Sequence, residues 1–125
     1  MRVLLDTHVF LWAVAGSPLL KPAARGLIEA ADEVYVSAAS IWEVAIKSRL
    51  GKIEADPVEL TGAIEASGFM HLPVTAVHAA GVGALELHHN DPFDRLLIAQ
   101  ALAEPLKLLT ADGVLTQYSD VVVLI

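Results

Sequence analysis

Acidic side chains stand where short apolar runs of the sequence give way to segments with a helical pattern. The four acids at these junctions are Asp6, Glu43, Asp94 and Asp112. In a parallel sheet covered by helices, such junctions fall outside the carboxyl ends of the strands, so we expect the four carboxylates to gather at one edge. Two bare carboxylates about 4 Å apart near a protein surface repel each other by roughly 4 kcal/mol. The pattern therefore predicts a bound cation.

A divalent cation with oxygen ligands would hold such carboxylates together. The chain has no cysteine, and hard cations choose carboxylates and water, so Mg²⁺ or Mn²⁺ is the expected cofactor. Such a site suits phosphoryl chemistry, because a metal lowers the pKa of bound water, shields the phosphate and stabilises the leaving oxygen.

Each acid also has a purely structural explanation as a helix cap. Ser40 and Glu43 have the spacing of a capping box. Asp91 and Asp94 flank a proline as the N-cap and third residue of a helix would. The other two acids could also begin helices. Taken singly, each acid is better explained as a cap, and only the presence of an acid at every junction favours the metal site.

Hydroxyl side chains flank the same junctions, at Thr7, Ser37, Ser40 and Thr110. These hydroxyls could orient a metal-bound water or a ligand carboxylate, although simple capping is the favoured explanation for each. The third acidic position is ambiguous, because Asp91 and Asp94 stand three residues apart on one helical face and either could reach the metal.

The elements that must position these residues alternate between strands and helices. The strand candidates are aliphatic on both faces and cover residues 3–5, 34–36, 106–109 and 121–124, with 70–72 as a weaker fifth. The helix candidates cover roughly residues 7–15, 19–31, 38–50, 57–67, 75–86 and 92–103. This alternation predicts one α/β domain over residues 1–125, in which helices flank a mostly parallel central sheet of four or five short strands.

Composition excludes several other classes of protein. No stretch approaches the run of about 20 apolar residues that a membrane span needs, and an acid at position 6 argues against a secretory signal. Without cysteine the chain suits a reducing cytoplasm. The net charge of −7 argues against a passive nucleic-acid binder, but not against an enzyme that meets phosphate through metal ions.

The chain is also unusually apolar, with 55% hydrophobic residues and a mean hydropathy of +0.58. Much of this surface must form the core, including most of the large side chains around Phe10, Trp12 and Trp42. The short segment 7–15 carries too many of them to bury all, so we expect some to form a groove for a partner.

Basic and histidine residues near the acids have two explanations each. His88 and His89 are best explained as solvated loop residues, with contact to RNA as the alternative. Arg95 would contact either a substrate phosphate or a nearby carboxylate. Lys47 is spaced to pair with Glu43 along a helix, and with Arg49 and Lys52 it complements the helix dipole or, less expected, guides RNA.

Four stretches of the chain together resemble the PIN domain, and within it the VapC-type ribonuclease toxins of toxin–antitoxin pairs. These stretches are Leu4-Leu-Asp-Thr-His8, Ser37-Ala-Ala-Ser-Ile-Trp-Glu43, Asp91-Pro-Phe-Asp-Arg-Leu-Leu-Ile-Ala-Gln100 and Leu109-Thr-Ala-Asp112. The resemblance runs from the first predicted strand to the last and so covers essentially the whole chain.

The resemblance implies a role for each of these positions. Asp6, Glu43 and Asp94 would bind the metal, and Asp112 would be the fourth acid, supporting a second ion or its water. Asp94 is selected because the family's ligand directly precedes the apolar helix, which leaves Asp91 as the N-cap. Thr7 and Thr110 match small hydroxyl positions near that cluster. The resemblance further implies a homodimer and a small antitoxin protein as partner.

The expected function is therefore a cytoplasmic, Mg²⁺- or Mn²⁺-dependent endoribonuclease, the toxin of a toxin–antitoxin pair, whose products carry 5′-phosphate and 3′-hydroxyl ends. One alternative is a catalytically silent α/β interaction module that uses its acids as caps. Another, with less support, is an aspartate-based phosphatase or phosphoacceptor. This class carries either an Asp-x-Asp motif or paired acids after the first strand, whereas this chain has Asp6-Thr7-His8. The identity of the RNA and the number of metal ions are left open by the sequence.

Overall fold

A sheet of five parallel strands forms the centre of the computed structural model, which describes residues 1–125. The strands are β1 (Arg2–Leu5), β2 (Glu33–Ser37), β3 (Met70–Leu72), β4 (Lys107–Thr110) and β5 (Val122–Leu124). Their order across the sheet is β3-β2-β1-β4-β5, and every neighbouring pair is parallel. The α/β prediction is confirmed, and the weak fifth strand is present at the predicted residues.

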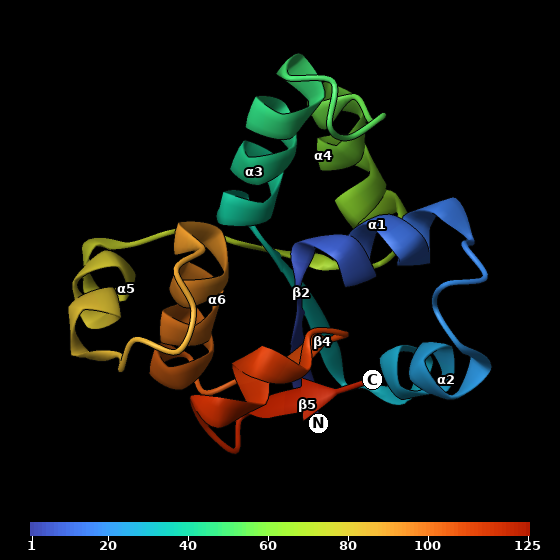
Figure 1. Ribbon diagram of the computed structural model, residues 1–125. Coiled ribbons are helices and arrows are strands. Elements are labelled where there is room, and N and C mark those ends of the chain that lie inside the picture. The colour runs from blue at the N-terminus through green and yellow to red at the C-terminus, as the bar shows by residue number, and fades with distance from the viewer.

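Helices cover both faces of this sheet (Figure 1). They are α1 (Thr7–Ala15), α2 (Pro22–Ala30), α3 (Ala38–Arg49), α4 (Pro57–Ala66), α5 (Ala76–Gly81) and α6 (Pro92–Ala103), with short 3₁₀ turns η1 (Val82–Ala84) and η2 (Gly113–Gln117). In Figure 1, α1, α2 and α4 lie to one side of the strands, and α5 and α6 lie to the other. The longest of these helices have 12 residues, and none has the length and apolarity to cross a membrane.

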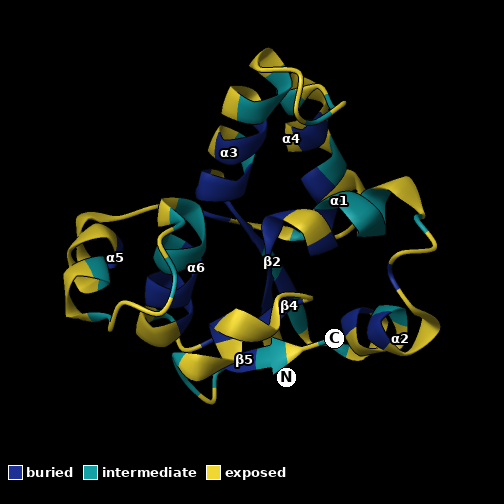
Figure 2. Cartoon of the chain, viewed as in Figure 1, coloured by how far each residue is buried: buried dark blue, intermediate teal, exposed yellow.

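The central strand β1 is buried on both faces, as its unbroken aliphatic sequence predicts. Val3 and Leu5 belong to the apolar cluster beneath α1, α2 and α4, where they pack with Phe10. Leu4 points to the opposite cluster, where Leu97 of α6 packs. Figure 2 shows the result, with dark blue strands at the centre and yellow outer helix faces. The two clusters fix β1 from both sides, so the residue after it has a defined position.

Two predicted helices are shorter in the structure than the sequence pattern suggests. The segment expected at residues 19–31 begins only at Pro22, because proline occupies the first helical position and the preceding residues form a turn. The segment expected at 75–86 leaves the α-helix after Gly81, and its last turn tightens to η1. The chain then crosses in an irregular loop to Asp91, where α6 begins.

Candidate metal centre at the carboxyl edge of the sheet

Asp6 directly follows β1 and is held from two sides. Its Oδ1 accepts a hydrogen bond from the backbone N–H of Val9 at 2.8 Å and thereby caps α1. Its Oδ2 accepts a hydrogen bond from the hydroxyl of Thr110, at the end of the neighbouring strand β4. Burial raises the pKa of Asp6, although both hydrogen bonds act in the opposite direction. Capping and a position at the sheet edge are therefore compatible for this acid.

Glu43 lies inside α3 and is only 3% exposed. The capping box expected for Ser40 and Glu43 is wrong, because α3 begins at Ala38 and its N-cap is Ser37. Residues 40 and 43 instead share the buried face of the helix. There Thr7 donates a hydrogen bond from Oγ1 to Glu43 Oε1 at 2.7 Å and lies 2.9 Å from Ser40 Oγ.

Lys47, one turn further along α3, forms an ion pair with Glu43 Oε2, as the spacing in the sequence predicts. The hydrogen bond to Glu43 raises the pKa of Lys47, with a smaller contribution from the charges of Asp91 and Asp94. Lys47 therefore supplies positive charge to the acidic cluster.

Asp91 and Asp94 have separate positions at the start of α6. Asp91 Oδ1 accepts from the backbone N–H groups of Phe93 and Asp94, at 2.8 and 3.0 Å, and is the N-cap. The carboxylate of Asp94 turns instead toward the other acids. Burial first, and then the negative charges of Asp91, Asp6 and Glu43 in that order, together raise the pKa of Asp94 to about 7. Carboxylates from three separate elements are thus close enough to disfavour each other's ionisation.

Asp112 follows β4 at the rim of this cluster, and its side chain is 44% exposed. Its Oδ1 caps η2 by accepting from the backbone N–H of Val114 at 3.0 Å, and its own N–H donates to Thr110 Oγ1 at 3.0 Å. A shallow hollow of about 370 Å³ opens beside it, lined also by Asp6, His8 and Trp12. The acids are therefore reachable from solvent on this side.

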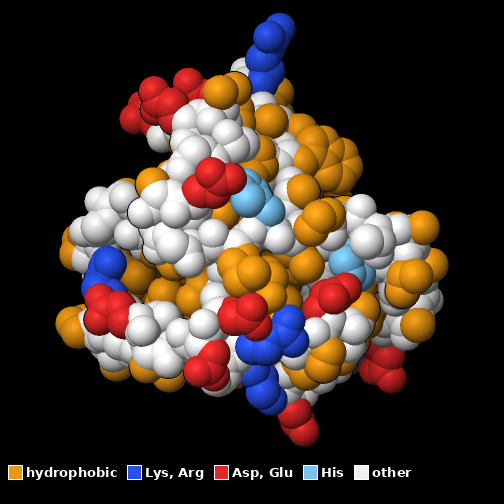
Figure 3. Space-filling model, turned by 180° about the vertical axis from the view of Figure 1, so that it is seen from behind, with side chains coloured by type: hydrophobic (Ala, Val, Ile, Leu, Met, Phe, Trp, Pro, Cys, Tyr) orange, Lys and Arg blue, Asp and Glu red, His pale blue; other side chains and the backbone are white.

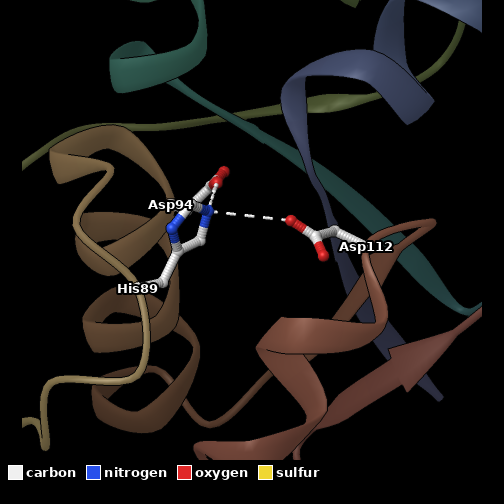
Figure 4. Close-up of side chains that lie close together, drawn as sticks. All are labelled: His89, Asp94 and Asp112. Atoms are coloured by element: carbon white, nitrogen blue, oxygen red, sulfur yellow. Dashed lines mark ion pairs between the residues drawn. The ribbon is translucent and has the colours of Figure 1, made fainter.

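His89 lies between two of the acids, which the sequence analysis did not predict. Its Nε2 stands 3.0 Å from Asp94 Oδ2 and 3.7 Å from Asp112 Oδ2 (Figure 4). His89 lies in a loop, as expected, but its side chain is only 29% exposed and is paired with carboxylates rather than simply solvated. The hint in the sequence was its position two residues before a helix cap whose helix carries a candidate ligand.

Arg95 makes no ion pair with a carboxylate, which was one of the two contacts expected for it. Its guanidinium donates to the backbone carbonyls of Glu86 at 3.0 Å and Val82 at 3.3 Å, and to the hydroxyl of Tyr118 at 3.2 Å. All of these partners but Tyr118 belong to η1 and the loop before α6. Several backbone carbonyls there have no helical hydrogen bond, and the Arg95 side chain donates to them. Arg95 thus binds loop carbonyls and Tyr118 and not a carboxylate.

Aromatic side chains stand beside two of the acids. Trp42 and Phe93 precede Glu43 and Asp94 in sequence and meet edge to face, with ring centroids 4.9 Å apart. Trp42 is 58% exposed, so it is among the large apolar side chains that the core does not bury. It lies one residue from the buried face of α3 and points outward.

The donor set of this cluster fits a hard divalent cation. It consists of carboxylate oxygens, together with one imidazole nitrogen. The candidate ligand atoms of His89, Asp94 and Asp112 all lie within 4.8 Å of one another, whereas Asp6 and Glu43 fall outside that group and are more deeply buried. The raised pKa of Asp94 indicates an excess of negative charge that a cation would relieve.

Comparison with known proteins reveals relatives over almost the whole chain. A family model described as the PIN domain matches residues 3–121. The Ribonuclease VapC22 of Mycobacterium tuberculosis is 34% identical over 116 residues, which cover 88% of this chain and 86% of the relative.

Solved structures with the same fold include three at low sequence identity. VapBC2 from Rickettsia felis, bound to a promoter DNA fragment, gives a TM-score of 0.69 at 15% identity, covering 100% of this chain and 98% of that one. A toxin–antitoxin complex from Klebsiella pneumoniae gives 0.68 at 19%, covering 98% and 96%. VapC20 of Mycobacterium tuberculosis, described as a Sarcin-Ricin loop cleaving toxin, gives 0.61 at 16%, covering 95% and 98%.

Proposed function

This chain belongs to the PIN-domain family and is a homologue of the VapC ribonuclease toxins, and from that premise we propose that it is a divalent-metal-dependent endoribonuclease. The observation that carries the proposal is the convergence of Asp6, Glu43 and Asp94 from three elements; the charges of the other two acids add to burial and to Asp91 in raising the pKa of Asp94 to about 7. Buried carboxylates held together in this way are stable as anions only with a counter-charge.

In this proposal Asp6, Glu43 and Asp94 hold the metal, and Asp112 is the fourth acid at the rim. When bound, Mg²⁺ or Mn²⁺ would lower the pKa of a water molecule and shield the negative charge of the phosphate. The protein's own contribution is orientation. Thr110 fixes Asp6 and Thr7 fixes Glu43 by the hydrogen bonds described above, so both carboxylates are pre-organised before substrate arrives.

The substrate that fits this centre is an RNA phosphodiester entering from the hollow beside Asp6 and Asp112. The chain carries a net charge of −7, and Lys and Arg form no continuous surface on the face shown in Figure 3. Because the net charge of the whole chain is negative, we expect attraction for the RNA backbone to come chiefly from the cation at the acids. Hydrolysis here would leave 5′-phosphate and 3′-hydroxyl ends, as the family resemblance implies.

Purified protein incubated with RNA tests this function directly. We expect cleavage with Mg²⁺ or Mn²⁺, none with EDTA, and a loss of at least about 100-fold in Asp94→Asn, because removing an essential catalytic group costs that much or more. Asp120→Asn is the matched control, since Asp120 is exposed and lies outside the cluster. Full activity in a folded Asp94→Asn protein would refute the assignment.

We further propose that the protein is controlled by a small antitoxin and forms a homodimer in the cytoplasm. Two of the structures that share its fold are of VapBC2 and of a toxin–antitoxin complex. The chain also leaves large apolar side chains exposed, among them Leu19, Trp42, Leu50 and Val58. Exposed side chains of this size could contribute apolar area to an interface with a partner. Light scattering of the isolated chain measures its oligomeric state.

The two alternative functions have less support. A silent module would keep buried Glu43 and half-buried Asp94 close to other carboxylates without a cation, which lowers stability and is not needed for capping. A phosphoacceptor of the classes considered carries an Asp-x-Asp motif or paired acids after the first strand, whereas β1 of this chain is followed by Asp6-Thr7-His8.

A further inference from the structure

His89 is aimed at the acidic cluster by a loop that is itself held in place. The hydroxyl of Tyr118 accepts a hydrogen bond from the backbone N–H of His89 at 2.8 Å and donates to its carbonyl at 3.3 Å. Arg95 reaches the same carbonyl at 3.5 Å and the carbonyl of Glu86 at 3.0 Å. Both backbone polar groups of His89 are therefore fixed by side chains from outside its loop.

These two side chains come from the segments that carry the acids nearest to His89. Arg95 directly follows Asp94 at the start of α6. Tyr118 directly follows η2, the turn that Asp112 caps. Arg95 also donates to the Tyr118 hydroxyl at 3.2 Å, which joins the two segments. We call Arg95 and Tyr118 together the loop clamp. It sets the position of His89 relative to both carboxylates at once.

The distances from His89 match those between neighbouring ligands on one ion. Two ligands about 2.1 Å from an ion and about 90° apart are separated by about 3.0 Å. Nε2 of His89 lies 3.0 Å from Asp94 Oδ2 and 3.7 Å from Asp112 Oδ2, and the ligand atoms of all three residues lie within 4.8 Å of one another. The imidazole side chain is 29% exposed, so it faces the reachable side of the cluster.

We propose that His89 is a nitrogen ligand of the metal centre on its Asp94 and Asp112 side, and that the loop clamp is what positions it. This inference rests on the proposed function and adds to it a preference for one metal ion over another. Imidazole is a good ligand for transition metals, whereas Mg²⁺ prefers oxygen ligands and water. A donor set of two carboxylates and one imidazole therefore favours Mn²⁺ over Mg²⁺ at this position.

Pulsed electron paramagnetic resonance of the Mn²⁺-loaded full chain tests the assignment without any measurement of activity. We expect a ¹⁴N hyperfine coupling in the wild type that is lost in His89→Gln. The coupling should persist in His8→Gln, because His8 lines the neighbouring hollow and is the other imidazole close to the acids. Calorimetry should show Mn²⁺ affinity about 10-fold weaker or more in His89→Gln, with Mg²⁺ affinity changed much less.

Tyr118→Phe tests the loop clamp separately. It removes the hydroxyl but keeps the ring, which stacks edge to face on His88 with centroids 5.0 Å apart. We expect a weaker ¹⁴N coupling and a Mn²⁺ affinity between those of the wild type and His89→Gln. An unchanged coupling and affinity in Tyr118→Phe would remove the loop clamp from the proposal.

The outcomes separate this inference from the function on which it rests. Wild-type protein that binds Mn²⁺ without nitrogen coupling overturns the role of His89 and leaves the carboxylate site standing. The imidazole would then be only an ion-pair partner of Asp94 and Asp112. Wild-type protein that binds no Mn²⁺ overturns both the ligand assignment and the metal centre.

Discussion

Thr110 donates a hydrogen bond to Asp6 across 104 residues of sequence. The two residues leave the adjacent strands β4 and β1 at the same edge, where the backbone N–H of Asp6 also donates to the carbonyl of Leu109 at 3.0 Å. The Thr110 hydroxyl also accepts from the N–H of Asp112. One hydroxyl thus sets the relative position of two acids of the candidate metal centre.

Thr110→Val should weaken metal binding while leaving the fold intact. Valine has nearly the same shape, but it leaves one oxygen of buried Asp6 without its donor. We expect metal affinity to fall by about 10- to 100-fold and the free energy of unfolding by about 1–3 kcal/mol. Calorimetry and urea unfolding measure the two effects. Thr116→Val is the control, since its hydroxyl bonds only to the carbonyl of Gly113 at the surface. Equal losses in both variants would contradict this account.

Lys47→Gln should destabilise the metal-free protein more than the metal-loaded one. Lys47 is the basic partner of buried Glu43, so its loss leaves that carboxylate without a counter-charge. A bound divalent cation replaces the lost positive charge. Melting temperatures with EDTA and with saturating Mn²⁺ measure the difference. Lys52→Gln, an exposed lysine beyond the end of α3, should behave like the wild type in both conditions. A deficit that Mn²⁺ does not reduce would separate Lys47 from the metal centre.

The metal-free protein should lose stability as pH rises from about 5 to about 8. The pKa of Asp94 is about 7 in the folded protein, above its ordinary value of 3.8, so folding favours the protonated form. That contribution is complete below the unfolded-state pKa and is lost as pH rises through about 7. Melting temperatures in EDTA across this range measure it, and Asp94→Asn should flatten the curve. Stability that rises between these pH values in the wild type alone would be the opposite of this prediction.

Added Mn²⁺ should reverse this trend, because the cation needs the ionised carboxylate. The increase in melting temperature on adding Mn²⁺ should therefore grow as pH rises through about 7. A constant increase over this range would mean that Asp94 is not among the groups that bind the cation.

Leu108→Ala should be strongly destabilising. Leu108 is fully buried in β4, in the apolar cluster beneath α6, so its truncation leaves a cavity between sheet and helix. We expect a loss of about 2–5 kcal/mol in the free energy of unfolding, measured by urea denaturation. Leu102→Ala on the exposed side of α6 should change it by about 0.5 kcal/mol or less. Similar losses for the two leucines would contradict the placement of Leu108 in the apolar cluster between the sheet and α6.

Most of the fold could be predicted from the sequence because its strands are short, aliphatic and buried on both faces. Residues 3–5 and 70–72 were recognised by this pattern, and helices α1 and α6 begin and end at the predicted residues. Prolines and acids at the helix starts allowed those boundaries to be predicted. The gathering of acids followed from topology alone, since parallel strands end at one edge. Their role as metal ligands stays a prediction.

Long-range side-chain contacts could not be predicted in the same way. The bonds of Thr7 to Glu43 and of Thr110 to Asp6 depend on how α1, α3 and β4 pack, and local capping explained the same residues equally well. The contacts that His89 and Arg95 make could not be predicted because the loop between η1 and α6 has no periodic pattern. The backbone of this loop reaches Arg95 only once the chain has folded.

The central place of β1 in the sheet has a consequence for synthesis on the ribosome. The first strand to be translated is flanked by β2 and β4, so it has to wait for a partner that emerges about a hundred residues later. Until Thr110 has left the exit tunnel, Asp6 has neither its hydroxyl donor nor the neighbouring strand. A nascent chain stalled before that point lacks both the hydroxyl that binds Asp6 and the fourth acid, Asp112. Cutting activity of the kind proposed above would therefore appear late in translation, after β4 has joined β1.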